Sequence, residues 1–288
     1  MTTTKFSRRD VLAAGAALVV SPALRALAAD SKRLFKLSAC DWSLGKAQHI
    51  EALDVAKAVG IDGVQVSFGE PGPRYDLRKP EVRQEYAERS RQLGIQVNSL
   101  AMGVLNSRAY ATDPQAEQWV VDCVGVMEQM KQRVVLLAFF GNGDIKGKPD
   151  LQKEVIRRLK KVVPAAEKAG VVLGIESWMN ADDHLRILDG VGSPAVQVYY
   201  DVCNMTDMGY DIGKEIRQLG RDRICEIHCK ENGFLLGHGK VDLNKAKAAI
   251  DDIGWSGWLV IEGATVRGKS LPECYQLNQK YLRSVFPT

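Results

Sequence analysis

The chain has 288 residues, of which 45% are hydrophobic and 26% are charged, and its formal net charge is +4. Residues 1–28 hold four basic side chains and one acidic one, so +3 of this charge lies there and about +1 remains for residues 29–288. A nearly neutral mature chain has no bulk attraction for nucleic acid or membrane, which argues against both as partners. The remaining length, about 260 residues, exceeds one β-sandwich and suits one α/β barrel.

Residues 1–28 have the composition of an export signal rather than that of a folded domain. The pair Arg8 and Arg9 precedes the apolar run "VLAAGAALVVSPALRALAA". This run is too short for a membrane span and is interrupted by Pro22 and Arg25, while the "ALA" near its end fits a small-x-small cleavage site. Paired arginines before such a run are typical of a twin-arginine signal. We therefore expect the twin-arginine export machinery as a partner, a periplasmic mature protein, and no stable membrane insertion after cleavage. The alternative is that the segment is retained as an N-terminal anchor.

Short apolar runs alternate with segments of helical periodicity along the rest of the chain. Eight runs have the character of strands: 34–40, 63–68, 95–101, 133–140, 171–176, 195–201, 224–229 and 257–262. Helical periodicity fills 50–60, 80–94 and 150–170, and each of these segments ends in a glycine, as helices before a strand often do. Eight strands alternating with helices predict a single-domain (β/α)8 TIM barrel over residues 29–288. An open doubly wound sheet is the alternative, although no G-x-G-x-x-G follows the first strand.

The last four predicted strands all deliver side chains that bind metals. These side chains are Glu176, Asp201, His228 and Glu262, spaced 25, 27 and 34 residues apart. The carboxyl ends of barrel strands converge on one face, so three carboxylates and an imidazole are expected together. Carboxylates crowded in a low-dielectric site repel one another unless a cation holds them. A divalent metal satisfies all four, and it explains why a run as apolar as "VVLGIE" ends on a carboxylate.

The motifs around these residues resemble the xylose isomerase-like barrel superfamily, the sugar phosphate isomerase/epimerase group. The matching segments are "GIESW", "VYYDVCN", "EIHCKE", "LGHGKVDL" and "GWLVIEG". The resemblance implies one divalent ion bound by the four residues, with Glu176 and Glu262 as acid/base catalysts on opposite faces of a sugar. Three oxygens and one nitrogen form a hard ligand set, so Mn²⁺ or Mg²⁺ fits best, with Co²⁺ or Zn²⁺ as further options.

Such a site suits proton abstraction next to a carbonyl. A cation that chelates the carbonyl and an adjacent hydroxyl stabilises the enediolate that forms, while a carboxylate removes the proton as general base. Return of the proton to the same carbon makes an epimer, and return to the neighbouring carbon makes an aldose/ketose isomer. Loss of a leaving group would instead make the protein a lyase or dehydratase on a keto-sugar or keto-glycoside. Binding without turnover would make it a sugar-binding barrel.

Two further positions depart from the ketose 3-epimerases of this group. Those enzymes have a substrate-contacting His three residues after the metal Asp and an Arg six residues after the metal His, where this chain has Asn204 and Phe234. A simple free-ketose 3-epimerase is therefore disfavoured, and Asn204 becomes a candidate for substrate binding. The apurinic-site endonuclease type of this barrel needs a three-metal cluster and many histidines, whereas this chain has four histidines and nearly neutral charge.

Other candidates for substrate binding follow from their places on the predicted barrel. Lys230 follows His228 by two residues and should point to the same side of its strand, where it could hold an anionic or enolate oxygen. Asp182 either contacts sugar hydroxyls or caps the helix that begins near it. His238, in "LGHGKVDL", either reaches the cleft or covers the barrel mouth. Trp42 and Trp178 follow the first and fifth strands, and their rings suit either sugar C–H surfaces or packing at the rim.

Overall fold

The computed structural model describes residues 35–287, so the predicted signal peptide at 1–28 lies outside the described residues. Eight parallel strands pair in chain order and close into a barrel, with β8 next to β1. The strands are β1 (Lys36–Cys40), β2 (Gly63–Ser67), β3 (Gln96–Met102), β4 (Val134–Phe139), β5 (Val172–Ser177), β6 (Val196–Asp201), β7 (Ile224–Glu231) and β8 (Trp258–Gly263). The predicted (β/α)8 barrel is confirmed, and the open sheet is wrong because the outer strands pair with each other.

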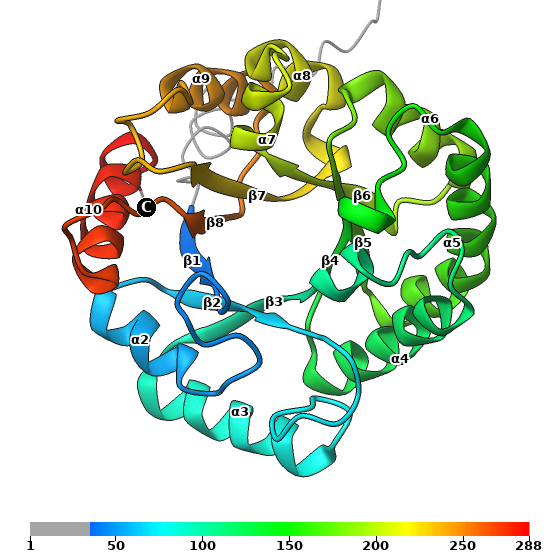
Figure 1. Cartoon of the computed structure of the whole chain (residues 1–288), viewed down its shortest axis with the longest axis horizontal. Coiled ribbons are helices and arrows are strands. Elements are labelled where there is room, and N and C mark those ends of the chain that lie inside the picture. The colour runs from blue at the N-terminus through cyan, green and yellow to red at the C-terminus, as the bar shows by residue number, and fades with distance from the viewer. Residues whose placement is uncertain (1–34, 288) are drawn as a thin grey trace, which may run out of the picture. The chain divides into compact units, whose positions relative to one another are not determined.

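Helices surround the barrel on its outer side, as the view along the barrel shows (Figure 1). They are α2 (Ala52–Val59), α3 (Pro80–Leu93), α4 (Pro114–Met130), α5 (Pro149–Ala169), α6 (Ala181–Val191), α7 (Val202–Asp207), α8 (Ile212–Leu219), α9 (Leu243–Ile253) and α10 (Leu271–Val285). Among the described residues, no helix combines the length and the apolar character that a membrane crossing requires.

The predicted glycines end the helices as expected. Gly60, Gly94 and Gly170 follow α2, α3 and α5 with φ of 83°, 67° and 68°, a left-handed conformation that other residues adopt at a cost. Their backbone N–H groups bond back into the last turn of each helix. Each helix therefore stops where the chain must turn into the next strand.

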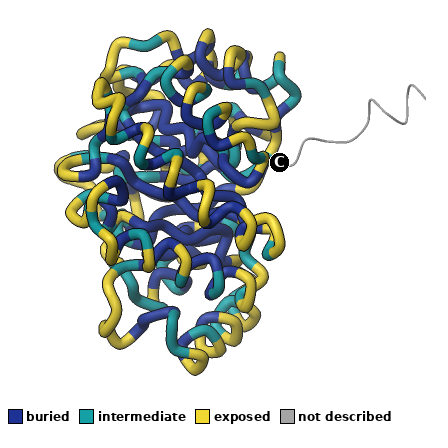
Figure 2. Tube along the Cα trace, turned by 90° about the vertical axis from the view of Figure 1, so that its right-hand side faces the viewer, coloured by how far each residue is buried: buried dark blue, intermediate teal, exposed yellow. Residues whose placement is uncertain are grey.

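The buried residues, dark blue in Figure 2, run through the middle of the molecule, and most residues of the eight strands are among them. Every residue of β4 and β5 is buried, as expected for strands covered on both faces. The barrel interior is filled at mid-height: a Cβ built on Gly174 would lie 2.7 Å from Cys225 Sγ and 3.2 Å from Tyr199 Cβ. Since the interior has no room there, an open site must lie at an end of the barrel.

The strand register brings the predicted ligands to similar levels along the barrel axis. Asp201 of β6 pairs with His228 of β7, and two residues further along β7, Lys230 pairs with Glu262 of β8. On the other side, Glu176 of β5 pairs with Ala138 of β4. The four strand ends therefore deliver their polar side chains to one level at the carboxyl end of the barrel.

Candidate metal centre and active site

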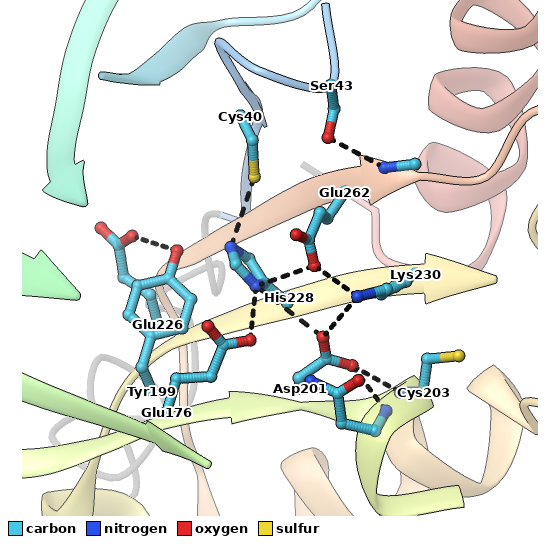
Figure 3. A network of polar contacts seen from close by, with 12 residues as sticks. Cys40, Ser43, Glu176, Tyr199, Asp201, Cys203, Glu226, His228, Lys230 and Glu262 are labelled. Carbon is cyan, nitrogen blue, oxygen red and sulfur yellow. Dashed lines mark hydrogen bonds and ion pairs between the residues drawn. The ribbon is translucent and has the colours of Figure 1, made fainter. Parts of the chain in front are cut away.

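Glu176, Asp201, His228 and Glu262 meet at the carboxyl end of the barrel (Figure 3). Each offers one ligand atom, and these four atoms lie within 4.8 Å of one another. His228 Nδ1 lies 3.0 Å from Glu176 Oε1, 3.5 Å from Glu262 Oε2 and 3.8 Å from Asp201 Oδ2. The imidazole nitrogen thus faces all three carboxylates, which is the arrangement that one shared cation requires.

The donor atoms fit a divalent cation. Asp201 is 1% exposed and His228 is 0% exposed. Asp201 Oδ1 accepts hydrogen bonds from the backbone N–H groups of Cys203 (2.7 Å) and Asn204 (2.9 Å), whereas its Oδ2 is buried without a hydrogen-bond partner. A buried carboxylate oxygen without a hydrogen-bond partner is costly. Coordination of a cation by Asp201 Oδ2 would remove this cost, so the atom suits a metal ligand.

Burial and mutual repulsion shift the acid–base properties of these groups in the metal-free site. Burial, reinforced by Glu176 and Glu262, raises the pKa of Asp201 to about 7. Burial alone would lower the pKa of His228, but the same two carboxylates and Asp201 outweigh it and raise that pKa to about 9. Without a metal, a proton on His228 therefore supplies the positive charge that the carboxylates need.

Glu262 is held by groups on both of its oxygens. The indole N–H of Trp42 donates to Oε1 at 3.0 Å, and Lys230 Nζ lies 3.0 Å from Oε2 and 3.9 Å from Asp201 Oδ2. Burial would raise the pKa of Glu262, but His228 and Lys230 lower it below its ordinary value. Glu262 is thus kept ionised, as a general base must be.

A cavity of about 400 Å³ opens above these residues. Its lining consists of Trp42, Ser67, Gly103, Asn106, Leu136, Ala138, Phe140, Glu176, Trp178, Asn204, Lys230 and Glu262. Both glutamates of the cluster line the cavity, whereas Asp201 and His228 lie outside this lining. The rings of Phe140 and Trp178 pack edge to face, with centroids 5.1 Å apart, on one wall. The site therefore combines an aromatic wall with two carboxylates that are open to a ligand.

The other predicted substrate contacts divide into two groups. Trp42, Trp178, Asn204 and Lys230 line the cavity as expected, although the polar atoms of Trp42 and Lys230 are engaged with Glu262.

Asp182 and His238 are exposed and lie outside the cavity lining. Asp182 accepts a hydrogen bond from Gln218, and Asn180 is the residue that caps α6, by accepting from the backbone N–H of Asp183. Of the two roles expected for Asp182, helix capping is therefore wrong.

Several residues at the site were not found by sequence reasoning. Asp41 accepts hydrogen bonds from the hydroxyl (2.6 Å) and backbone N–H (2.8 Å) of Ser67, which ties the loop carrying Trp42 to β2. Gln65 contacts His228, and Glu226 is 1% exposed inside the barrel. The available signal was a polar side chain inside an apolar run, as in "GVQVSF" and "ICEIHC", because such a residue must find a partner.

Eight closed parallel strands and a carboxylate-rich cluster at their carboxyl ends define a TIM-barrel protein with a candidate metal centre. The chain belongs to the xylose isomerase-like TIM barrel family, whose model matches residues 53–285. The resemblance expected from the motifs is thus confirmed.

Individual relatives are distant in sequence. The chain is 24% identical over 220 residues to a 2-epi-5-epi-valiolone 7-phosphate 2-epimerase of Actinoplanes sp., covering 73% of this chain and 80% of that protein. It is similar in structure to the D-psicose 3-epimerase of Clostridium cellulolyticum H10 (TM-score 0.75, 18% identity, 88% of this chain and 100% of that one). It is also similar to a 3-keto-D-glucoside 4-epimerase of E. coli (TM-score 0.72, 14% identity, 87% and 100%).

Proposed function

We propose that the protein is a divalent-metal-dependent sugar epimerase or isomerase that abstracts a proton next to a carbonyl. The observation that carries this proposal is the division of the four-residue cluster, in which Glu176 and Glu262 line the cavity while Asp201 and His228 are buried beneath it. When bound, the cation supplies positive charge to the oxygen that becomes negative during proton removal. Mn²⁺ is the first candidate, because three oxygens and one nitrogen form a hard ligand set.

The two glutamates have the placement that proton transfer on a sugar requires. They come from β5 and β8, the outer strands of the four that form the cluster, so they can flank a ring seated between them. One carboxylate removes a proton from one face, and the other returns a proton on the opposite face. Lys230, which contacts Glu262, is placed to stabilise a developing negative oxygen. The ring of Trp178 and the amide of Asn204 offer an apolar surface and hydrogen bonds to the sugar.

The comparisons support the same class of reaction. The relative from Actinoplanes and the two solved structures are all named as epimerases, and each name concerns a sugar or a sugar-like ring. They differ in substrate, since one is phosphorylated and one is a keto-glucoside. The class of reaction is therefore a stronger inference than the substrate.

The charges around the cavity favour an uncharged sugar. Of the described residues that line it, Lys230 is the single cation, and its ammonium group already contacts Glu262. A divalent ion and Lys230 together balance the three carboxylates of the cluster. A phosphate dianion would need additional cationic groups. We therefore propose a free or glycosidic keto-sugar as substrate.

The experiment is an NMR assay of proton exchange in D₂O. Mature protein loaded with Mn²⁺ is incubated with ketoses, aldoses, a keto-glycoside and a matched sugar phosphate, and the sugars are separated from the metal before spectra are recorded. We expect the C–H signal next to the carbonyl of an uncharged sugar to disappear, with an epimer or isomer forming alongside. Glu262→Gln, loaded with the same metal, is the matched control and should lose the exchange.

Each other outcome has a defined meaning. Elimination products without exchange would replace the isomerase by a lyase on the same site. Binding of sugars without exchange, with metal present at one ion per chain, would make the protein a sugar-binding barrel. Faster turnover of the phosphate than of its uncharged partner would overturn the proposed substrate class.

A further inference from the structure

The structure assigns a positioning role to Gln65, which holds His228 from the side opposite the metal ligands. Gln65 Oε1 lies 3.0 Å from His228 Nε2, while Nδ1 of the same ring faces the three carboxylates. Cys40 Sγ lies 3.4 Å from Gln65 Oε1 and 3.4 Å from His228 Nε2. We propose that Gln65, anchored by Tyr199 and Glu226, fixes the imidazole with its proton on Nε2 and so leaves Nδ1 free for the cation.

The orientation of the Gln65 amide follows from a chain of hydrogen bonds across the barrel. The hydroxyls of Tyr199 and Ser99 donate to Glu226 Oε2 at 2.9 and 2.8 Å. Each hydroxyl has one hydrogen, so toward Gln65 each can only accept. Gln65 Nε2 donates to them at 2.8 Å (Tyr199) and 3.2 Å (Ser99). The amide nitrogen must therefore face these hydroxyls, which turns the carbonyl oxygen toward His228.

The buried carboxylate of Glu226 is the fixed end of this chain, as the contact between Tyr199 and Glu226 in Figure 3 shows. Glu226 also accepts from the amide of Asn98 at 3.1 and 3.3 Å, so donors surround it. The ring of Tyr199 packs against the His228 imidazole with centroids 4.6 Å apart and planes at 65°. The ring plane and the position of its proton are thus both restrained from within the barrel.

This arrangement explains why Gln65 and Glu226 are polar although both are buried. An apolar side chain could fill the same space but could not hold the imidazole of His228 by hydrogen bonds. A carbonyl acceptor on the outer nitrogen of a metal-binding histidine fixes its tautomer and raises its basicity, and loss of such a partner typically lowers metal affinity 10- to 100-fold. Gln65 comes from β2, on the opposite side of the barrel from the four ligand strands. The inference rests on the metal site of the proposed function and concerns only how that site is oriented.

The test compares Mn²⁺ affinity, measured by calorimetry on metal-free protein, in variants that separate hydrogen bonding from packing. Gln65→Met keeps an unbranched side chain of similar length but lacks the acceptor, and we expect it to bind Mn²⁺ 10- to 100-fold more weakly. Gln65→Glu keeps an acceptor for the Nε2 proton and should bind within a few-fold of wild type. Ser38→Ala removes another buried hydroxyl, one without a hydrogen-bond partner, and should bind like wild type.

A spectroscopic measurement reads the imidazole directly. In protein loaded with diamagnetic Zn²⁺, the Nε2 proton of His228 should appear in ¹H–¹⁵N spectra and exchange slowly in wild type and in Gln65→Glu. In Gln65→Met it should exchange rapidly or disappear. If Gln65→Met binds as tightly as wild type while Gln65→Glu binds poorly, Gln65 acts by packing and the inference is wrong. If wild type itself binds no Mn²⁺, the metal site fails, and this inference fails with it.

Discussion

Replacing Asp201 by asparagine should stabilise the metal-free protein while removing its metal site. The pKa of Asp201 is raised from 3.8 to about 7, so the folded state holds this carboxylate ionised only at a cost. A shift of about three pKa units corresponds to a free-energy cost of about 4 kcal/mol for the ionised carboxylate in the folded state, as an upper limit. With an unfolding entropy of about 2.1 cal/mol/K per residue, that gain raises the melting temperature by roughly 8 °C.

The sign of the pH dependence follows from the raised pKa. A raised carboxyl pKa means that the folded protein binds this proton more tightly than the unfolded chain, so the cost of Asp201 grows as the pH rises from 4 toward 7. The gain from Asp201→Asn should therefore be full above pH 7 and should vanish near pH 4. Asn keeps Oδ1 as the cap of α7, whereas Asp201→Ala removes this cap and should forfeit about 1 kcal/mol of the gain.

The assay is calorimetric melting of metal-free protein at pH 8 and pH 5, repeated with saturating Mn²⁺. Asp222→Asn, at a carboxylate that is 91% exposed, is the control and should change stability by less than about 0.5 kcal/mol. Mn²⁺ at 100 times its dissociation constant should stabilise wild type by about 2.7 kcal/mol and the Asp201 variants far less. Destabilisation by Asp201→Asn at pH 8 would refute the reasoning, as would equal stabilisation of both proteins by Mn²⁺.

Three other predictions concern catalysis, acid stability and export. Glu262→Gln keeps a carbonyl oxygen for the ion but no base, so it should retain Mn²⁺ and lose about 10²–10⁴ in rate, since that is what a positioned base contributes. His228→Ala should lose the metal and recover part of its activity at high Mn²⁺. Metal content and turnover measured side by side on both variants test these expectations. Near-normal turnover in Glu262→Gln would exclude Glu262 as a base. Burial lowers the pKa of His184 from 6.5 to about 4, so stability should fall by up to about 3 kcal/mol as the pH drops through this interval. His184→Gln should remove this loss of stability, as measured by urea unfolding at several pH values. If the stability of the variant depends on pH as that of wild type does, His184 is not the cause of the loss. Replacing Arg8 and Arg9 by lysine should leave uncleaved precursor in the cytoplasm; normal export in fractionated cells would indicate a general secretory signal instead.

The fold could be predicted because its physical signals are local. Parallel strands covered on both faces read as continuous apolar runs, and glycines such as Gly60 and Gly170 mark the helix ends that precede them. The clustering of the four candidate ligands could be predicted for a related reason: once the runs form a barrel, strand ends such as Glu176 and Glu262 must share one face.

Contacts across the barrel interior could not be predicted in this way. The bond between Gln65 and His228 joins residues 163 positions apart, and the alternation along a strand does not show which side chain meets which across the interior. Residues further from the strand ends could not be placed from the sequence either. Asp182 and His238 lie at the start of a helix and in a loop, where the path of the chain is set by local contacts such as the Asn180 cap.

The most direct test of the central claim is a crystal structure of Mn²⁺-loaded protein with anomalous diffraction data collected at the manganese edge. We predict one strong anomalous peak per chain at the carboxyl end of the barrel, within bonding distance of His228 Nδ1 and of oxygens from Glu176, Asp201 and Glu262. A peak at another place, or none at the cluster in crystals soaked with excess Mn²⁺, would contradict the claim that these residues form a metal centre.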